Sequence, residues 1–277
     1  HVDSRLGKDS NDGRSATRAW RSLARLAAAP LAPGDRVELA CGSTWRETLR
    51  LGASGSLSAP IVVAAPVAGC SQAPTIDGSV DLPAARWQRQ TAGVWRQALA
   101  SVPLQLFSAA GPWVDAHHPN RGASGPAWLP MASDGNLSTA NGRDVSTRLD
   151  TGTDLVLPAT ATLGPGTRVR VRTAAFVIDD LAVAGTDGRV LNLATPSTYP
   201  LKAGWGYLLT GQAWMVDSPG EWFHDAATGR LLAAALGSSG SPQLPTSATV
   251  QTLGIDLRDR SHVVMDGLTV RKVGTGA

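Results

Sequence analysis

The densest group of side chains able to do chemistry lies between positions 115 and 121. It holds Asp115, His117, His118 and Arg121. Histidine is the natural acid or base near neutral pH, and a guanidinium can clamp a carboxylate through two hydrogen bonds. These four residues are the catalytic candidates. The same residues also fit an ordinary polar loop after Trp113, and the sequence leaves both interpretations open.

Tryptophan is abundant, with nine in the chain. An indole ring with an apolar face and a polar edge suits stacking on a sugar ring. Trp113 and Trp128 flank the titratable group, and they are the candidates for substrate binding. The alternative for most tryptophans is a place in the hydrophobic core.

Other carboxylates are weaker candidates. Residues 9–13 read Asp-Ser-Asn-Asp-Gly, which is half of a calcium-binding loop, but the glutamate such a loop needs is missing from the following residues. Bound Ca²⁺ is therefore the alternative at this loop, and a polar turn is the favoured interpretation. Asp179 and Asp180 should point to opposite faces of a strand. Glu221, in a Pro-Gly turn, is expected to bind backbone amides.

Composition narrows the class of protein. The chain has 277 residues, 43% hydrophobic and 17% charged, which excludes an intrinsically disordered chain. No run approaches the roughly 18 apolar residues of a membrane span. The net charge is +3 without a block of like charges, so no nucleic-acid partner is expected. Thirty glycines and eighteen prolines favour many short elements over long helices.

Periodicity divides the chain into three segments. Residues 14–29 carry an apolar stripe at helical spacing, with Ser15 or Thr17 as the cap. Short strands follow near 37–39, 49–51, 61–63 and 75–78. Short strands with the same pattern, bounded by turn residues, return at 263–270. The segment between, about 82–250, holds seven tryptophans and longer strands, such as the alternating 168–172.

The returning strands share a pattern with the early ones. Residues 76–80 and 265–270 both read apolar, Asp, Gly, then alternation, and Val37 to Val62 is a step of 25 residues. Periods of 20–50 residues indicate solenoids, whose coils bury their inner faces by stacking. An ordinary β-sandwich with accidental Asp-Gly turns remains the alternative.

Several segments resemble secreted right-handed parallel β-helix proteins of the pectate-lyase-like group, which includes polysaccharide lyases and glycoside hydrolases. The first is the opening, with Val-Asp-Ser at 2–4, Gly-Lys-Asp-Ser-Asn-Asp-Gly at 7–13 and Ala-Trp-Arg-Ser-Leu at 19–23. Further matching segments are residues 31–37, 59–79, 218–223 and 228–231. His117–Asn120 departs from the group's usual Arg-Tyr-Pro-Asn.

The resemblance implies a mainly β fold: the start of a right-handed parallel β-helix with an N-terminal capping helix and a large inserted β-rich domain. Residues 1–81 would form the cap and first coils, 82–250 the insert, and 251–277 the resumed helix. Such proteins normally have more coils, so the chain is expected to be part of a longer protein, and its catalytic groups would lie beyond Ala277.

The implied activity is that of an extracellular lyase or glycoside hydrolase acting on a polysaccharide or oligosaccharide. The alternative is a non-catalytic glycan-binding or structural module, and the remaining β-helix is the other expected partner. A Cys41–Cys70 disulfide is expected, because strands one coil apart bring the two turns together. Such a bond needs an oxidising compartment, so the expected location is secreted, periplasmic or at the cell surface. Two free thiols in a cytosolic protein are the alternative.

Overall fold

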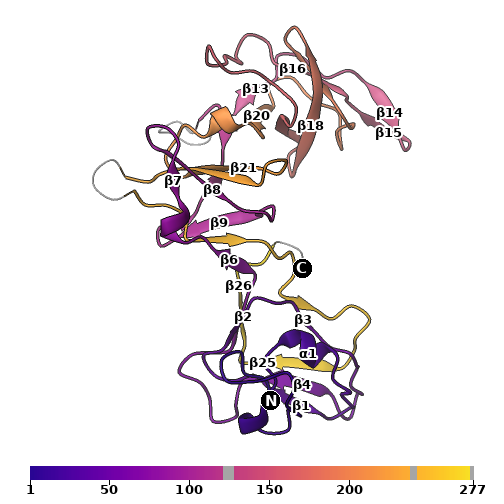
Figure 1. The fold of residues 1–277 in the computed structure, drawn as a ribbon. Helices are drawn as coiled ribbons and strands as arrows, with labels where there is room; N and C mark the ends of the chain where they lie inside the picture. Colours follow the sequence, from indigo (N-terminus) through magenta and orange to yellow (C-terminus); the bar gives the residue numbers. More distant parts are fainter. Residues whose placement is uncertain (121–127, 238–241, 275–277) are drawn as a thin grey trace. The chain divides into compact units, whose positions relative to one another are not determined.

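The computed structural model describes residues 1–120, 128–237 and 242–274. The chain is mainly β and divides into two compact units (Figure 1). The first unit comprises residues 1–83, 101–112 and 245–277, and the second comprises residues 84–100 and 113–244. Residues 82–83, 101–112 and 245–250 thus belong to the first unit, although they fall within the range predicted for the insert. Among the described residues, no helix is long and apolar enough to cross a membrane.

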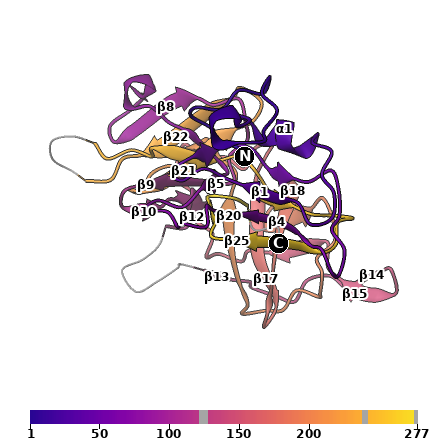
Figure 2. The ribbon, with the colours of Figure 1, turned by 90° about the horizontal axis from the view of Figure 1, so that it is seen from below.

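Parallel strands from both ends of the chain build the first unit. β4 (Ile61–Ala64) lies between β1 (Arg36–Glu38) and β25 (Val263–Asp266), and all three are parallel (Figure 2). The returning strand therefore pairs with an early one, as the shared Asp-Gly pattern predicts. The register differs by one residue from the predicted step, because Val37 pairs with Val63 rather than Val62.

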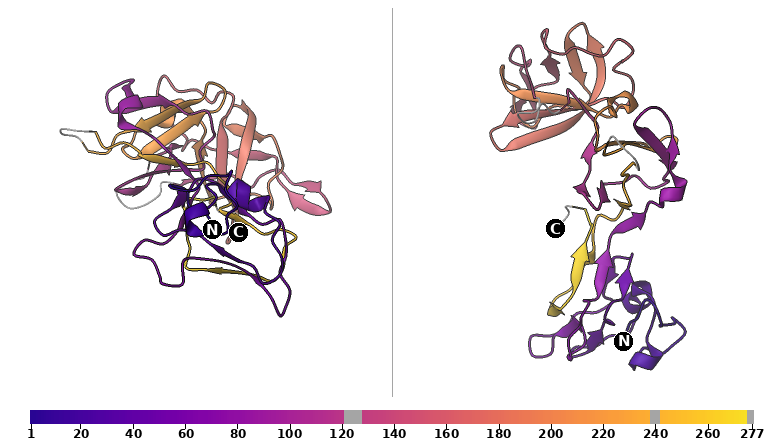
Figure 3. Two further views of the ribbon diagram at one scale, coloured as in Figure 1. Left: turned by 60° about the horizontal axis from the view of Figure 1, so that its bottom comes forward. Right: turned by 90° about the vertical axis from the view of Figure 1, so that its left-hand side faces the viewer.

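Two further parallel sheets complete this arrangement. In one, β5 (Thr75–Asp77) lies between β2 (Thr44–Trp45) and β26 (Thr269–Arg271). In the other, β3 (Leu49–Arg50) pairs with β24 (Ile255–Asp256). In Figure 3 the yellow C-terminal strands run alongside the indigo and purple strands of the N-terminal segment. The alternating apolar side chains of these short strands meet in one core, formed by Val2, Leu23, Leu26, Val37, Leu39, Trp45, Leu49, Leu51, Ile61, Val63 and Ile76.

The helix predicted over 14–29 is wrong in extent. A 3-10 helix spans Ala16–Arg18, and α1 spans only Leu23–Ala27, against β3. Between them Trp20 is extended: its amide donates to His1 O (3.0 Å), and it bridges Val2 in parallel. Ser22, rather than Ser15 or Thr17, caps α1 by accepting from the Arg25 amide at 3.0 Å. Long-range pairing of Trp20 thus overrides a helical apolar spacing.

A disulfide joins Cys41 and Cys70, as predicted, with Cα atoms 5.4 Å apart. Cys41 follows β1 and Cys70 follows β4, so the bond links the turns after two paired strands. An antiparallel sheet completes the first unit, in the order β10 (Gly111–Pro112), β9 (Gln105–Ser108), β23 (Ser247–Thr249) and β6 (Ser79–Asp81).

The second unit contains two larger sheets. One has the order β11 (Val114–Asp115), β21 (Glu221–Asp225), β22 (Arg230–Ala234), β8 (Val94–Ala98) and β7 (Gln88–Arg89). The other has the order β12 (His117–His118), β20 (Gly206–Thr210), β17 (Arg168–Ala174), β18 (Val177–Asp187), β19 (Val190–Leu193) and β16 (Arg148–Asp150), with β13 (Leu129–Pro130) also on β20. A hairpin of β14 (Ser138–Ala140) and β15 (Arg143–Val145) and the 3-10 helices Ala84–Arg86 and Ala213–Met215 complete the unit.

Strand β17 has one buried, apolar face and one polar face. Val169 and Val171 are fully buried in the core of the second unit, next to Tyr207 and Leu209 of β20. The three arginines at 168, 170 and 172 point to the other face because successive side chains alternate along a strand. The strict alternation predicted from the sequence is therefore confirmed, and it places three positive charges in a row.

Candidate functional site

The polar face of β17 carries a network of charges. Asp180 of β18 accepts from Arg168 Nε through one carboxylate oxygen (2.6 Å) and from Arg170 Nε through the other (3.1 Å). Asp115 of β11 joins the same network, because its Oδ2 accepts from Arg170 Nη2 at 2.5 Å. A single guanidinium therefore binds two carboxylates.

The electrostatics of Arg170 follow from this position. Burial disfavours its charged form, but hydrogen bonds and Coulomb attraction from Asp115 and Asp180 outweigh burial and raise the pKa of Arg170. Arg170 is thus held fully charged. Both carboxylates have oxygens committed to arginine, which is the arrangement of an ion-pair network.

His117 lies beside this network and is buried, with 6% of its surface exposed. Its Nδ1 lies 3.0 Å from the carbonyl oxygen of Asp115 and 3.2 Å from Oε1 of Glu221. Glu221 Oε2 accepts from the amides of Ser218 (3.0 Å) and Asp217 (3.3 Å), as predicted for this glutamate. His117 of β12 therefore lies against both β11 and the first residue of β21.

His118 points to the other face of its strand. Its Nε2 lies 2.9 Å from the carbonyl oxygen of Val156, and its ring makes an edge contact with Trp214 at 5.4 Å between centroids. The structure brings Asp115 and His117 together and separates His118 from them. Arg121, the fourth predicted residue, lies outside the described residues.

Two cavities lie on the polar face, and Trp128 lines both. The first has a volume of about 350 Å³ and is lined by Val114, Asp115, His117, Trp128, Arg170, Ile178 and Leu208. The second has a volume of about 540 Å³ and is lined by Trp128, Pro130, Arg172, Ala175, Gly204, Trp205 and Gly206. Trp113, the other predicted stacking residue, is only 3% exposed and presents no ring face to solvent.

The other carboxylates singled out in the sequence make hydrogen bonds that hold turns and strands in place. Asp9 accepts from the amides of Arg21 and Ser22 at 2.9 Å and from the Ser22 hydroxyl at 2.8 Å, so it closes a polar turn. Asp179 accepts from the amide and hydroxyl of Thr198, on the opposite face from Asp180, as predicted. Within the described ranges, no group of three or more His, Cys, Asp or Glu residues is arranged to hold a metal ion.

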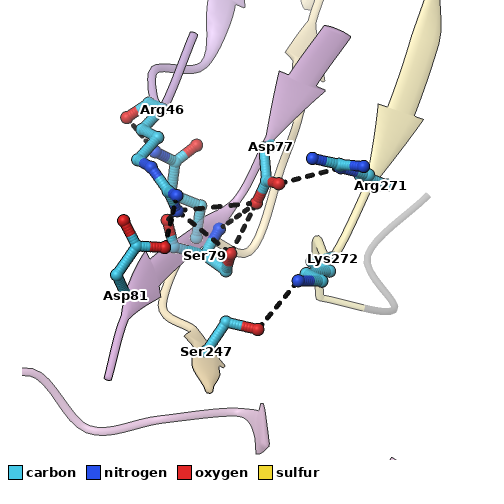
Figure 4. A network of polar contacts seen from close by, with 8 residues as sticks. Arg46, Asp77, Ser79, Asp81, Ser247, Arg271 and Lys272 are labelled. Atoms are coloured by element: carbon cyan, nitrogen blue, oxygen red, sulfur yellow. Dashed lines mark hydrogen bonds and ion pairs between the residues drawn. The ribbon is translucent and has the colours of Figure 1, made fainter. Parts of the chain in front are cut away.

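Sequence reasoning missed a buried acid in the first unit. Asp77, 1% exposed, accepts from the Ser79 hydroxyl (2.5 Å) and amide (3.0 Å) and from Arg271 Nε (2.8 Å), and Arg46 lies 3.8 Å away (Figure 4). This acid joins β5 to β6 and β26. The signal was present, since Asp77 is the aspartate of the first Asp-Gly pattern, but nothing in the sequence distinguished it from exposed Asp266 of the second.

Comparisons with known proteins bear on the fold. No protein-family model matches the chain, and no curated protein sequence does. A solved structure described as a glycoside hydrolase superposes with a TM-score of 0.68 at 13% identity, covering 99% of this chain and 50% of that one. The mainly β fold of this chain thus matches the fold of about half of that protein.

Two structures of a GH136 lacto-N-biosidase from Eubacterium ramulus also match. They are 29% and 28% identical over 37% of this chain and 14% of theirs, with a TM-score of 0.25, which is too low to support an argument. The similarity to the first glycoside hydrolase establishes fold alone.

Proposed function

We propose that this chain is part of an extracellular, carbohydrate-active protein of the glycoside hydrolase or polysaccharide lyase type. The observation that carries the proposal is the superposition of almost the whole chain, both units included, on half of a glycoside hydrolase. Hydrolysis is favoured over elimination because that protein is described as a hydrolase.

Within this proposal, the parallel strands of the first unit are the opening coils of a right-handed parallel β-helix, and α1 covers their first end. The three parallel sheets around one core support this assignment. The second unit, with the boundaries given above, is then an insertion between two coils.

The edge formed by β25 and β26 supports the same assignment. Each strand pairs on one side only, with β4 or β5. Val264 and Val270 are 43% and 40% exposed, and Val263 and Met265 are only partly buried against the core. An exposed apolar strand edge is a template for further pairing, and a solenoid coil is stable only between neighbours. We propose that further coils of the natural protein cover this edge.

An extracellular location is supported by the Cys41–Cys70 disulfide, because such bonds persist in oxidising compartments. The bond is placed where it fixes the first two strands of the stack to one another.

The second unit is proposed to bind carbohydrate, with Trp128 as the stacking residue. Catalysis is assigned to the additional coils. The contacts of Asp115 and His117 favour this division, because Asp115 is ion-paired to Arg170 and buried His117 bridges a carbonyl and Glu221. A general acid or base must instead reach the substrate within about 2.6–3.2 Å. His118, bonded to Val156, is proposed to hold the strand in place.

The test is incubation of the longest natural polypeptide containing this sequence with a panel of neutral and acidic polysaccharides. Hydrolysis releases reducing ends without absorbance at 235 nm, and elimination produces both. The proposal predicts new reducing ends with at least one polysaccharide. A folded protein that produces neither signal on any member of a broad panel would contradict it.

A further inference from the structure

The larger of the two cavities that Trp128 lines combines aromatic rings with one charged group. Trp128, Trp205 and Pro130 supply apolar walls, two glycines expose backbone, and Arg172 supplies the only charge among the described residues of the lining. Its volume of about 540 Å³ falls within the range of small-molecule binding sites.

Trp128 is seated here by a glycine. A Cβ placed on Gly206 would lie 2.8 Å from Trp128 Cβ and 3.3 Å from its ring atoms Cε3 and Cγ. Gly206 belongs to β20 and pairs with Pro130. The missing side chain therefore lets the indole lie against the sheet, where it lines both cavities.

Arg172 differs from the two arginines that precede it on the same face. Arg168 and Arg170 are neutralised by Asp180 and Asp115. Arg172 is exposed and has no acidic partner among the residues the structure describes, and its cross-strand neighbour on β18 is Ile178. One unpaired guanidinium thus stands beside an aromatic cavity.

We propose that this cavity binds a negatively charged sugar unit of a glycan, with the Trp128 ring stacked on the pyranose and Arg172 bound to its carboxylate or sulfate. A guanidinium matches both anions through parallel hydrogen bonds. The inference rests on the proposed carbohydrate function and narrows it to acidic glycans for this unit.

Calorimetric titration of the purified chain tests the charge. The ligands are trigalacturonate, the neutral galactose trimer made from it by carboxyl reduction, and a sulfated galactan trimer. The expected result is that at least one anionic trimer binds about tenfold more tightly than the neutral one, the size of one charge-assisted contact. Arg172→Gln should remove this preference. Arg14→Gln, on an exposed arginine of the first unit with no ion pair among the described residues, makes the same change in net charge and should preserve it.

A second pair of variants tests, without changing the net charge, whether Gly206 leaves the space that the Trp128 ring occupies. Gly206→Ala should displace Trp128 and weaken binding of every trimer by about tenfold or more. Gly185→Ala is the matched control, since a Cβ there meets nothing within 4 Å, and it should bind as the parent does. Circular dichroism of both variants confirms that they are folded.

The outcomes distinguish the acidic-sugar site from carbohydrate binding in general. Preference for the carboxylate or for the sulfate that depends on Arg172 supports the site and identifies its anion. Equal binding of neutral and anionic trimers, or a preference that survives Arg172→Gln, overturns the acidic-sugar inference while leaving carbohydrate binding intact. Absence of binding by every trimer also overturns the inference, and the polysaccharide panel then decides the proposed function independently.

Discussion

Replacing Asp77 by asparagine tests how the first unit is held together. Asp77 is almost fully buried and accepts hydrogen bonds from Ser79 and Arg271, which lie on β6 and β26. Asparagine keeps the shape and one acceptor oxygen but removes the charge. The substitution therefore weakens the link between the N-terminal and C-terminal strands without opening a cavity.

The magnitude follows from the exposure of the partners. A hydrogen bond to a charged group contributes about 1.5–3 kcal/mol. The Arg271 and Arg46 side chains are 55% and 40% exposed, so solvent screens their share, and asparagine can still accept from Ser79. We expect Asp77→Asn to lower the free energy of unfolding by about 1–3 kcal/mol. The melting temperature of the first unit should fall by roughly 3–10 °C.

Asp266→Asn is the matched control. Asp266 occupies the second Asp-Gly pattern, is exposed, and shows no side-chain partner in the described part of the chain. Its substitution should stay within about 0.5 kcal/mol. Calorimetric melting of the two variants beside the parent makes the comparison, and equal melting temperatures for both variants would refute the reasoning.

The same residue predicts a pH dependence. Burial opposes ionisation of Asp77, but hydrogen bonds from Ser79 and Arg271 outweigh it and hold the pKa of Asp77 below its ordinary value. A carboxyl with a lowered folded-state pKa contributes stability above its unfolded pKa and loses it as pH falls through the folded value. The difference between the parent and Asp77→Asn should therefore be constant from pH 5 to 8 and shrink below about pH 4. A difference that widens in acid would contradict the sign.

Three further predictions concern other elements. Joint replacement of Cys41 and Cys70 by serine should cost the first unit about 3 kcal/mol in urea titrations, because the bond closes a loop of 29 residues; two alkylatable thiols in unreduced, denatured parent protein would show that the bond is absent. His117→Ala should lower the stability of the second unit by about 1–3 kcal/mol in calorimetry, since it removes a buried side chain that packs against Glu221, and an unchanged melting curve would count against this role. Amide hydrogens at 263–266 and 269–271 should exchange more slowly in a longer natural polypeptide than in this chain if further coils pair there; equal rates would argue against added coils.

The early and returning strands were predictable because their signals are local. Residues 61–63 and 263–266 are short apolar runs bounded by turns, and the repeated Asp-Gly pattern links strands at opposite ends of the chain. The disulfide followed from the spacing of two turns. These features depend on period and turn chemistry, which sequence carries directly.

The misjudged elements depend on long-range contacts. Trp20 has helical spacing with Leu23, Ala24 and Ala27, yet its backbone pairs with Val2. The candidate site shows the same limit. That Arg170 bridges Asp115 and Asp180, and that Trp128 rests on Gly206, depends on how separate strands register, which no local pattern encodes.

Carbohydrate recognition is tested most directly by affinity electrophoresis of the purified chain through native gels that contain soluble polysaccharides, acidic and neutral. The structure predicts retarded migration in at least one gel and loss of that retardation in Trp128→Ala, with the disulfide intact throughout. Unchanged migration of the folded parent in every gel, or retardation that Trp128→Ala preserves, would contradict the proposed role of the second unit.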